Sequence, residues 1–517
     1  MKTAHLLRCL LAPPCGVGGL RLSRRSSAPR IWTVLIGLCL GVAVPLAWAQ
    51  VVYGQGDVEA GKRVYEWRCA LCHGVTGDGK GPGAERLAPR PRDFTTGTYK
   101  IRTTEGKVPT DQDIFRIITE GMPGTSMPGW RMLPERDRWN LVAYLKTFAP
   151  DAFESPPKPV ELPPEVASSA ESVARGKEMY EAIECFKCHG VQGRADGESR
   201  AELTDDWGRF VPPANLTKRW TFRGGARPVD IAMRIANGVA GTPMPAFLDA
   251  VEKPEDVWHL TNYILTLGPP SPRYATLVTV TAVSDDIPDD PAAEFWTAIA
   301  PSRIPLMGQV IVDPRNFNPS VDLVSVRAAY NDREIVFHLS WDDPTESPGD
   351  GEKTFPDAVS LQFPPRITGG VERPYFLMGD DTEAVYLLRW EQGTGVKELT
   401  AHGPTKIAPI EGSEATGKAT WREGQYRVVM RRALASGSDS QPAFEPRRFT
   451  PVAFQAWDGG AGETGARMSL TSWYYLRLEE PQSNRRFVVP PVVALLTFVA
   501  MAGVVRAANR RRQERTR

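Results

Sequence analysis

The chain has 517 residues, which is long enough for about three domains of the usual ~150 residues each. Its 62 lysine and arginine residues almost cancel its 61 aspartate and glutamate residues. The chain therefore has no overall positive charge that would attract nucleic acid, and we expect no nucleic-acid partner.

Residues 1–49 have the pattern of a signal peptide. A basic stretch precedes an apolar run from Ile31, and Ala47-Trp48-Ala49 forms a small-x-small cleavage site before Gln50. The apolar run nearly reaches the length of a membrane span, so an uncleaved N-terminal anchor is the alternative. In either case we expect the chain to be exported.

Two short motifs dominate the chemistry of the sequence: "CALCH" at Cys69–His73 and "CFKCH" at Cys185–His189. This pattern is typical of haem c attachment, in which two thiols bond to the porphyrin and the histidine binds the iron. A zinc site would need further Cys or His ligands, and a redox dithiol would need a βαβ setting. We therefore predict two covalent haem c groups, attached at Cys69, Cys72, Cys185 and Cys188, with His73 and His189 as axial ligands.

Residues 57–150 and 173–269 repeat one another at an offset of 116 positions, from Cys69 to Cys185. "GMPGTSMPGW" in the first copy aligns with "GVAGTPMPAF" in the second. Met127 then falls opposite Met244, each followed by proline, whereas Met122 falls opposite Val239. Methionine is the usual partner of histidine in cytochromes c, so we predict Met127 and Met244 as the second axial ligands.

Both copies resemble class I cytochrome c domains. The resemblance implies two small all-α domains in which the helix at Gly61 or Gly176 crosses the helix at Trp139 or Trp258. Between the copies, residues 151–172 include "SPPKPVELPPEV", which predicts an extended, proline-rich linker.

Residues 285–480 contain short runs rich in β-branched and aromatic residues, such as "EIVFHLSW" and "VAFQAW". Turn-forming clusters such as "WDGGAGETG" separate these runs. The pattern predicts an antiparallel β-sandwich.

Three phrases in this region are "DAVSLQFP", "PYFLMGDDTEAVYLLRW" and "VAFQAWDGGAGETGARMSLTSWYYL". They resemble the haem b-binding gamma subunits of ethylbenzene dehydrogenase and dimethylsulfide dehydrogenase. The resemblance implies one non-covalent haem b between a methionine, matched by Met378, and a lysine, whose place is taken by Met468. Three possibilities stay open: Met468 is itself the ligand, the site is empty, or a lysine elsewhere replaces it, namely Lys353, Lys397, Lys406 or Lys418.

Residues 487–505 form a charge-free run of transmembrane length, and the basic residues 506–517 follow it. The positive-inside rule assigns this tail to the cytoplasm. We therefore expect a single C-terminal helix in the cell inner membrane, with the domains on the periplasmic side.

No motif of a substrate-activating centre accompanies the predicted haems, so we expect electron transport and no catalysis by the chain alone. The gamma-subunit resemblance implies a molybdenum catalytic subunit and an iron–sulfur subunit as partners, with a soluble or membrane redox carrier as the respiratory acceptor or donor. The main alternative is a stand-alone membrane-tethered dihaem cytochrome c that uses the sandwich for docking. A haem peroxidase with an open iron position is a third possibility.

Overall fold

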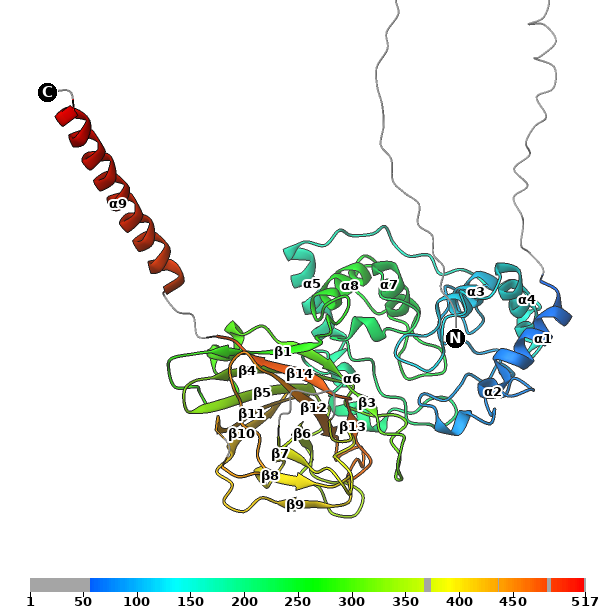
Figure 1. The fold of residues 1–517 in the computed structure, drawn as a ribbon. Coiled ribbons are helices and arrows are strands. Elements are labelled where there is room, and N and C mark those ends of the chain that lie inside the picture. Colours follow the sequence, from blue (N-terminus) through cyan, green and yellow to red (C-terminus); the bar gives the residue numbers. More distant parts are fainter. Residues whose placement is uncertain (1–55, 367–372, 436, 481–484, 516–517) are drawn as a thin grey trace, which may run out of the picture. The chain divides into compact units, whose positions relative to one another are not determined.

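The computed structural model describes residues 56–366, 373–435, 437–480 and 485–515 (Figure 1). The predicted signal peptide, residues 1–49, lies outside the described residues, so its cleavage stays a prediction. Along the described chain, helices come first, strands follow, and one long helix ends the chain. This order agrees with the predicted fold class.

The first helical unit crosses its two main helices at a glycine. A Cβ on Gly61 would lie 2.0 Å from the carbonyl oxygen of Asn140, so the close approach requires glycine. Thr110 starts another helix of this unit with a capping box completed by Asp113. The helices are α1 (Val58–Arg68), α2 (Ala70–His73), α3 (Asp111–Glu120) and α4 (Glu135–Lys146), with a 3₁₀ turn at Ala84–Arg86.

The second helical unit repeats this construction. A Cβ on Gly176 would lie 2.0 Å from the carbonyl oxygen of His259, so the predicted crossing is confirmed in both units. Figure 1 shows α7 and α8 side by side. The helices are α5 (Ala170–Ala182), α6 (Phe186–His189), α7 (Pro228–Asn237) and α8 (Asp256–Thr266), with 3₁₀ turns at Glu198–Glu202 and Arg219–Thr221.

The proline-rich segment between the units packs against both of them. It follows a 3₁₀ turn at Pro150–Phe153. Trp258 donates its indole N–H to the carbonyl of Pro163 at 2.8 Å. The amide of Val160 donates to the carbonyl of Thr103 at 2.9 Å. The segment is therefore held through one acceptor at a proline, which keeps its carbonyl although it lacks an N–H, and through one backbone donor. Helix α5 begins at Ala170, inside the predicted linker.

Eleven of the described strands form one hydrogen-bonded path in the order β10-β11-β5-β4-β1-β14-β12-β6-β7-β8-β9. Off this path, β2 pairs with β4, and β13 pairs with β12 and β3. A short 3₁₀ turn, Glu294–Ala298, precedes β2. The strands are β1 (Leu277–Ala282), β2 (Ser302–Pro305), β3 (Met307–Gly308), β4 (Leu323–Tyr330), β5 (Glu334–Asp342), β6 (Ala358–Phe363), β7 (Val385–Glu391), β8 (Gly395–Ala401), β9 (Ile407–Pro409), β10 (Thr416–Arg422), β11 (Gln425–Ala433), β12 (Phe449–Trp457), β13 (Ser469–Leu470) and β14 (Tyr474–Leu478).

The two halves of this path face one another across an apolar core. Trp341 on β5 packs 6.2 Å from Trp390 on β7, and Phe337 on β5 packs 6.0 Å from Phe363 on β6, between ring centroids. The arrangement is a sandwich, as predicted, with two differences. The sheet starts at Leu277, before the expected residue 285, and β1 runs parallel to both β4 and β14.

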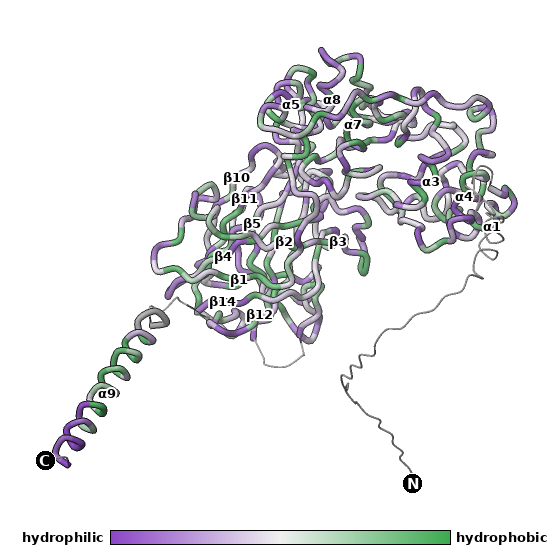
Figure 2. Tube along the Cα trace, turned by 90° about the horizontal axis from the view of Figure 1, so that it is seen from above, coloured by the Kyte–Doolittle hydropathy of each residue, from purple (hydrophilic) through white to green (hydrophobic). Residues whose placement is uncertain are grey.

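The chain ends in the helix α9, Arg485–Arg515. Its residues Val489–Arg515 are long and apolar enough to cross a membrane by length and composition. In Figure 2 the hydrophobic colour covers the first part of α9 and the hydrophilic colour its last turns. The helix therefore continues through most of the predicted basic tail instead of ending at residue 505.

Candidate haem sites

Each helical unit contains an apolar cavity at its Cys-x-x-Cys-His motif. The cavity of the first unit has a volume of about 390 Å³, and that of the second about 340 Å³. The first is lined by the predicted residues Cys69, Cys72, His73 and Met127, and the second by Cys185, Cys188, His189 and Met244. The structure thus brings each predicted set together around one cavity, although the methionine of each set is more than 50 positions from the cysteines and histidine in the sequence.

The two histidines are held in the same way. His73 Nδ1 lies 3.0 Å from the carbonyl oxygen of Arg92, and His189 Nδ1 lies 2.9 Å from that of Ala214. A carbonyl only accepts, so Nδ1 carries the proton and Nε2 keeps its lone pair. Burial lowers the pKa of both histidines, which favours the neutral imidazole that can bind a metal.

The methionine loops are also built alike. The Thr125 hydroxyl accepts from the Met127 amide at 3.1 Å, and the Thr242 hydroxyl accepts from the Met244 amide at 3.3 Å. The carbonyls of both methionines accept a backbone amide across the loop. One difference was not expected from the alignment: Met122 lines the first cavity beside Met127. The first cavity therefore offers two thioethers.

The four described cysteines form no disulfide. Burial raises the pKa of Cys69 and that of Cys185 to about 12, so both are neutral thiols at pH 7. Two unpaired thiols beside a histidine and an apolar cavity fit the covalent attachment of a porphyrin.

The two cavities share a wall. Lys100, Ile101 and Arg223 line both of them, although Lys100 and Ile101 belong to the first unit and Arg223 to the second. Burial lowers the pKa of Lys100 to about 8 and that of Arg223 below its ordinary range. Partly buried cations whose charge is unfavourable in this way fit a bound group with carboxylates, such as the propionates of haem.

Buried contacts hold the two units together beside this wall. Arg102 donates to the side-chain and main-chain oxygens of Asn237, at 3.1 and 3.2 Å. Asn237 in turn donates to the carbonyl of Thr104 at 2.8 Å. Sequence patterns do not reveal such contacts, because the residues involved are more than a hundred positions apart.

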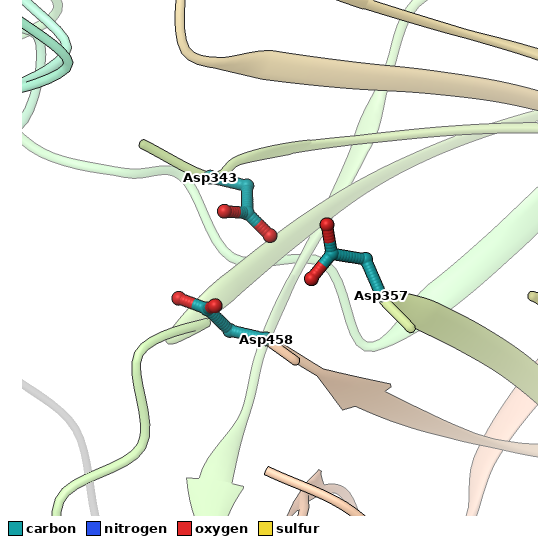
Figure 3. Close-up of side chains that lie close together, drawn as sticks. All are labelled: Asp343, Asp357 and Asp458. Carbon is teal, nitrogen blue, oxygen red and sulfur yellow. The ribbon is translucent and has the colours of Figure 1, made fainter. Parts of the chain in front are cut away.

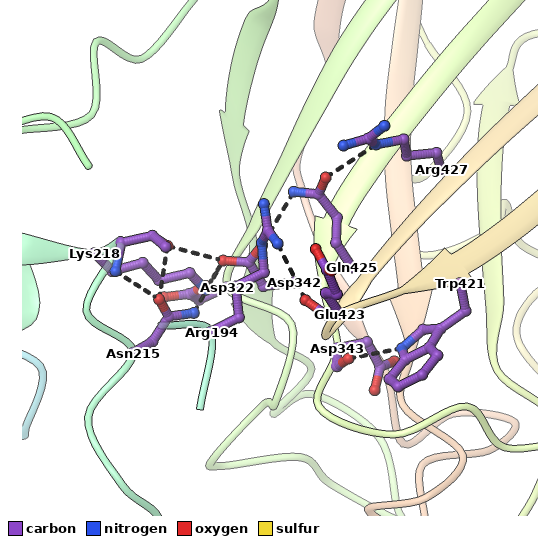
Figure 4. A network of polar contacts seen from close by, with 11 residues as sticks. Arg194, Asn215, Lys218, Asp322, Asp342, Asp343, Trp421, Glu423, Gln425 and Arg427 are labelled. Carbon is purple, nitrogen blue, oxygen red and sulfur yellow. Dashed lines mark hydrogen bonds and ion pairs between the residues drawn. The ribbon is translucent and has the colours of Figure 1, made fainter. Parts of the chain in front are cut away.

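The second helical unit also contacts the edge of the β-sandwich through polar side chains (Figure 4). Asn215 donates to Asp342 at 2.9 Å, Lys218 pairs with Asp322 at 2.5 Å, and Arg194 donates to the carbonyl of Glu423 at 3.1 Å. Burial alone would lower the pKa of Lys218, but Asp322 and Asp342 together hold it above its ordinary value. Lys218 is therefore charged and paired.

Within the sandwich, Met378 and Met468 are both fully buried and belong to one apolar cluster with Trp457. Met378 has a φ of 58°, a strained value for a side chain other than glycine. The lysines considered from the sequence are all exposed: Lys353, Lys397, Lys406 and Lys418. The structure therefore unites the two methionines and leaves these lysines outside the cluster. Two neutral sulfur donors in an apolar setting fit haem iron.

Three family models match separate parts of the chain. Residues 56–145 match cytochrome c oxidase, cbb3-type, subunit III; residues 173–268 match cytochrome c; and residues 293–392 match ethylbenzene dehydrogenase. The cysteine motifs fall inside the first two matches, and Met378 falls inside the third.

Relatives of known description match parts of the chain. A putative respiratory nitrate reductase haem subunit of Haloferax mediterranei is 27% identical, over 44% of this chain and 79% of its own length. The gamma subunit of dimethylsulfide dehydrogenase from Rhodovulum sulfidophilum is 29% identical, over 37% of this chain and 76% of its own. Cytochrome c of Theileria annulata is 30% identical, over 19% of this chain and 90% of its own.

Two helical units with this geometry, followed by a sandwich, define a multidomain electron-transfer cytochrome with a candidate membrane anchor. The chain belongs to the cytochrome c family, and its two cytochrome c domains are of the type that carries covalent haem c. They are joined to a domain of the ethylbenzene dehydrogenase type.

Proposed function

We propose that this chain is the membrane-anchored haem subunit of a respiratory oxidoreductase complex, and that it relays electrons between a catalytic partner and a redox carrier. The observation that carries the proposal is the wall shared by two cavities, each of which gathers two thiols, a histidine and a methionine. Bound haem would supply one-electron exchange at these positions.

The chain's own residues would divide the work as follows. Cys69 and Cys72 anchor the porphyrin in the first cavity, and Cys185 and Cys188 anchor it in the second. His73 and His189 offer Nε2 to the iron, because Nδ1 of each is occupied by a carbonyl. Met127 and Met244 would each supply a further iron ligand, and a neutral thioether in that role would favour a high reduction potential.

In the sandwich, Met378 and Met468 would hold a third, non-covalent haem b. The support is their burial in one cluster and the exposure of all four lysines of this domain. A pyridine haemochrome assay on the full chain is expected to give two covalent haems and one extractable haem. A result with only covalent haem would refute the haem b proposal while leaving the two c-type sites in place.

The partner class rests on the relatives, two of which are subunits of a nitrate reductase and a dimethylsulfide dehydrogenase. By resemblance, the partners would be a molybdenum catalytic subunit and an iron–sulfur subunit. Purification of the tagged full chain from solubilised membranes, followed by subunit identification and molybdenum analysis, tests this. Recovery of the cytochrome alone, without molybdenum, would favour the stand-alone carrier instead.

The location proposed is the inner membrane, with α9 as the single anchor and the haem domains in the periplasm. The apolar part of α9 and its arginine-rich end support this orientation. Protease added to intact spheroplasts should digest the haem domains. Protection of these domains until the membrane is lysed would reverse the orientation.

A further inference from the structure

Three buried carboxylates converge in the sandwich, away from the residues described for the haem sites. Asp343 directly follows β5, Asp357 directly precedes β6, and Asp458 directly follows β12. One oxygen from each carboxylate lies within 4.8 Å of the others. Figure 3 shows the three side chains turned toward a common space. Their exposed fractions are 0%, 0% and 3%.

Neutral donors fix two of these carboxylates in place. Asp357 accepts from the amides of Gly459 and Ser347, at 2.7 and 2.6 Å, and from the hydroxyl of Tyr426 at 2.8 Å. Asp458 accepts from the amide of Ala461 at 2.8 Å through Oδ1 and from the hydroxyl of Ser320 through Oδ2. These hydrogen bonds position the oxygens but do not neutralise the negative charges.

The third carboxylate has an oxygen without a partner. Asp343 Oδ1 accepts from the amide of Thr345 at 3.1 Å, whereas Oδ2 has no hydrogen-bond partner. The side chain is fully buried and points toward Asp357 and Asp458 (Figure 3). A buried, unsatisfied carboxylate oxygen is costly unless some group fills the space in front of it.

No cationic side chain fills that space among the described residues, since none of the three aspartates forms an ion pair there with lysine, arginine or histidine. Three buried carboxylates that converge in this way without a described counter-charge favour a bound positive charge.

We propose that Asp343, Asp357 and Asp458 form a calcium site. The donors are carboxylate oxygens without sulfur or imidazole, which suits a hard cation and disfavours zinc and copper. Each of the three carboxylates offers one oxygen to the common space, and calcium accepts oxygen ligands in flexible geometry. Magnesium usually keeps several of its waters, which a fully buried cluster accommodates poorly.

The position of the site suggests what the ion does. Asp343 follows Asp342, which contacts the second cytochrome domain through Asn215. Asp458 follows Trp457, which packs in the cluster of Met378 and Met468. A calcium ion here would tie the strand that meets the cytochrome domain to the strand that supports the methionine pair.

The first test uses the full-length, haem-loaded protein. Elemental analysis after purification in calcium-containing buffer should find about one calcium per chain, and EGTA treatment should remove it. Adding about 1 mM calcium, the range of extracellular sites, should then raise the unfolding midpoint by about 5 °C, and equal magnesium should not. Absence of both bound calcium and a calcium-dependent shift would overturn the proposal and leave protons as the bound positive charge.

A matched pair of variants locates the effect. Asp343→Asn should be at least as stable as the wild type in EGTA, because it removes a repelled charge, but its calcium affinity should fall at least tenfold. Asp332→Asn, at an exposed aspartate of the same domain, should keep the full calcium response. Equal losses in both variants would contradict the assignment. Should Asp343→Asn fail to fold, calorimetric titration of the EGTA-treated wild type with calcium alone still decides between binding and no binding.

Discussion

Asn215 donates to the Asp342 carboxylate at 2.9 Å, and it directly follows Ala214, whose carbonyl holds Nδ1 of His189. The peptide that orients the proposed iron ligand of the second domain is thus attached to the end of β5. The contact therefore connects the end of β5 to the backbone that holds His189. This contact links two domains that the sequence presents only as neighbours along the chain.

Replacing Asp342 should weaken this connection. Asp342→Ala removes the acceptor of Asn215 and one of the two carboxylates that keep Lys218 charged. We expect the free energy of unfolding to fall by about 2 kcal/mol, because the partly buried charge of Lys218 loses a partner. Chemical unfolding followed by haem absorbance and by tryptophan fluorescence measures it. Asp286→Ala, which removes an exposed ion pair with Arg333, is the control and should leave the midpoint unchanged.

Two variants can decide which of two methionines is the iron ligand in the first cavity. Met127→Leu should lower the reduction potential of one haem by on the order of 0.1 V, because axial ligands move haem potentials over about 0.8 V. Met122 lines the same cavity, so Met122→Leu is the matched control, and we expect it to change the reduction potential little. Potentiometric titration with optical detection measures the reduction potentials of both variants. The reverse pattern would make Met122 the ligand and break the parallel between the two domains.

Much of both cytochrome sites could be predicted because the chain contains the unit twice. The cysteines and histidine are adjacent in sequence, and the second copy distinguishes Met127 from Met122 as the shared position. The shared wall of Lys100 and Arg223 could not be predicted, because it depends on how two separately folded domains pack. The same holds for Asp343, Asp357 and Asp458, which look like ordinary turn residues in sequence. The strand β1 lies before residue 285, where the sandwich was expected to begin, and its parallel pairing with β4 and β14 depends on contacts between segments far apart in the sequence.

The methionine pair of the sandwich should control the extractable haem. Met378→Ala and Met468→Ala are each expected to lower the extractable haem content while leaving both covalent haems, because each removes one buried sulfur of the same cluster. Met307→Ala is the control, since Met307 belongs to the same domain but is 71% exposed. Acid–acetone extraction followed by absorbance measures all three. An unchanged haem content in Met378→Ala would refute its role as a ligand.

His338 should make the sandwich less stable in mild acid. Its Nε2 donates to the carbonyl of Pro291 at 3.0 Å, while Nδ1 is buried without a partner. Burial lowers its pKa to about 4, so the unfolded chain binds a proton more readily than the folded one between about pH 6.5 and pH 4. Stability is therefore fully retained above pH 6.5 and falls as the pH drops through this window, by up to about 3 kcal/mol.

The variant His338→Gln tests this contribution, because its amide can still donate to Pro291 but does not titrate in this range. Unfolding midpoints of the variant and the wild type should converge as the pH falls from 6.5 to 4. Buried carboxylates with a raised pKa, such as Asp357, act in the opposite direction in the metal-free protein, but they are present in both forms and cancel in the comparison. A constant difference across the window would contradict the assignment.

Arg223 should influence both covalent haems at once. It comes from the second domain, yet it lines both cavities, and a buried cation there favours the reduced state of an iron on either side. Arg223→Gln should therefore lower two reduction potentials together, each by on the order of tens of mV for one charge acting through a partly buried region. Arg131→Gln, at an arginine that is exposed and lines neither cavity, should change neither potential. If Arg223→Gln shifted the potential of only one haem, the cavities would not share an electrostatic wall in solution, and direct transfer between the two domains would lose its main structural support.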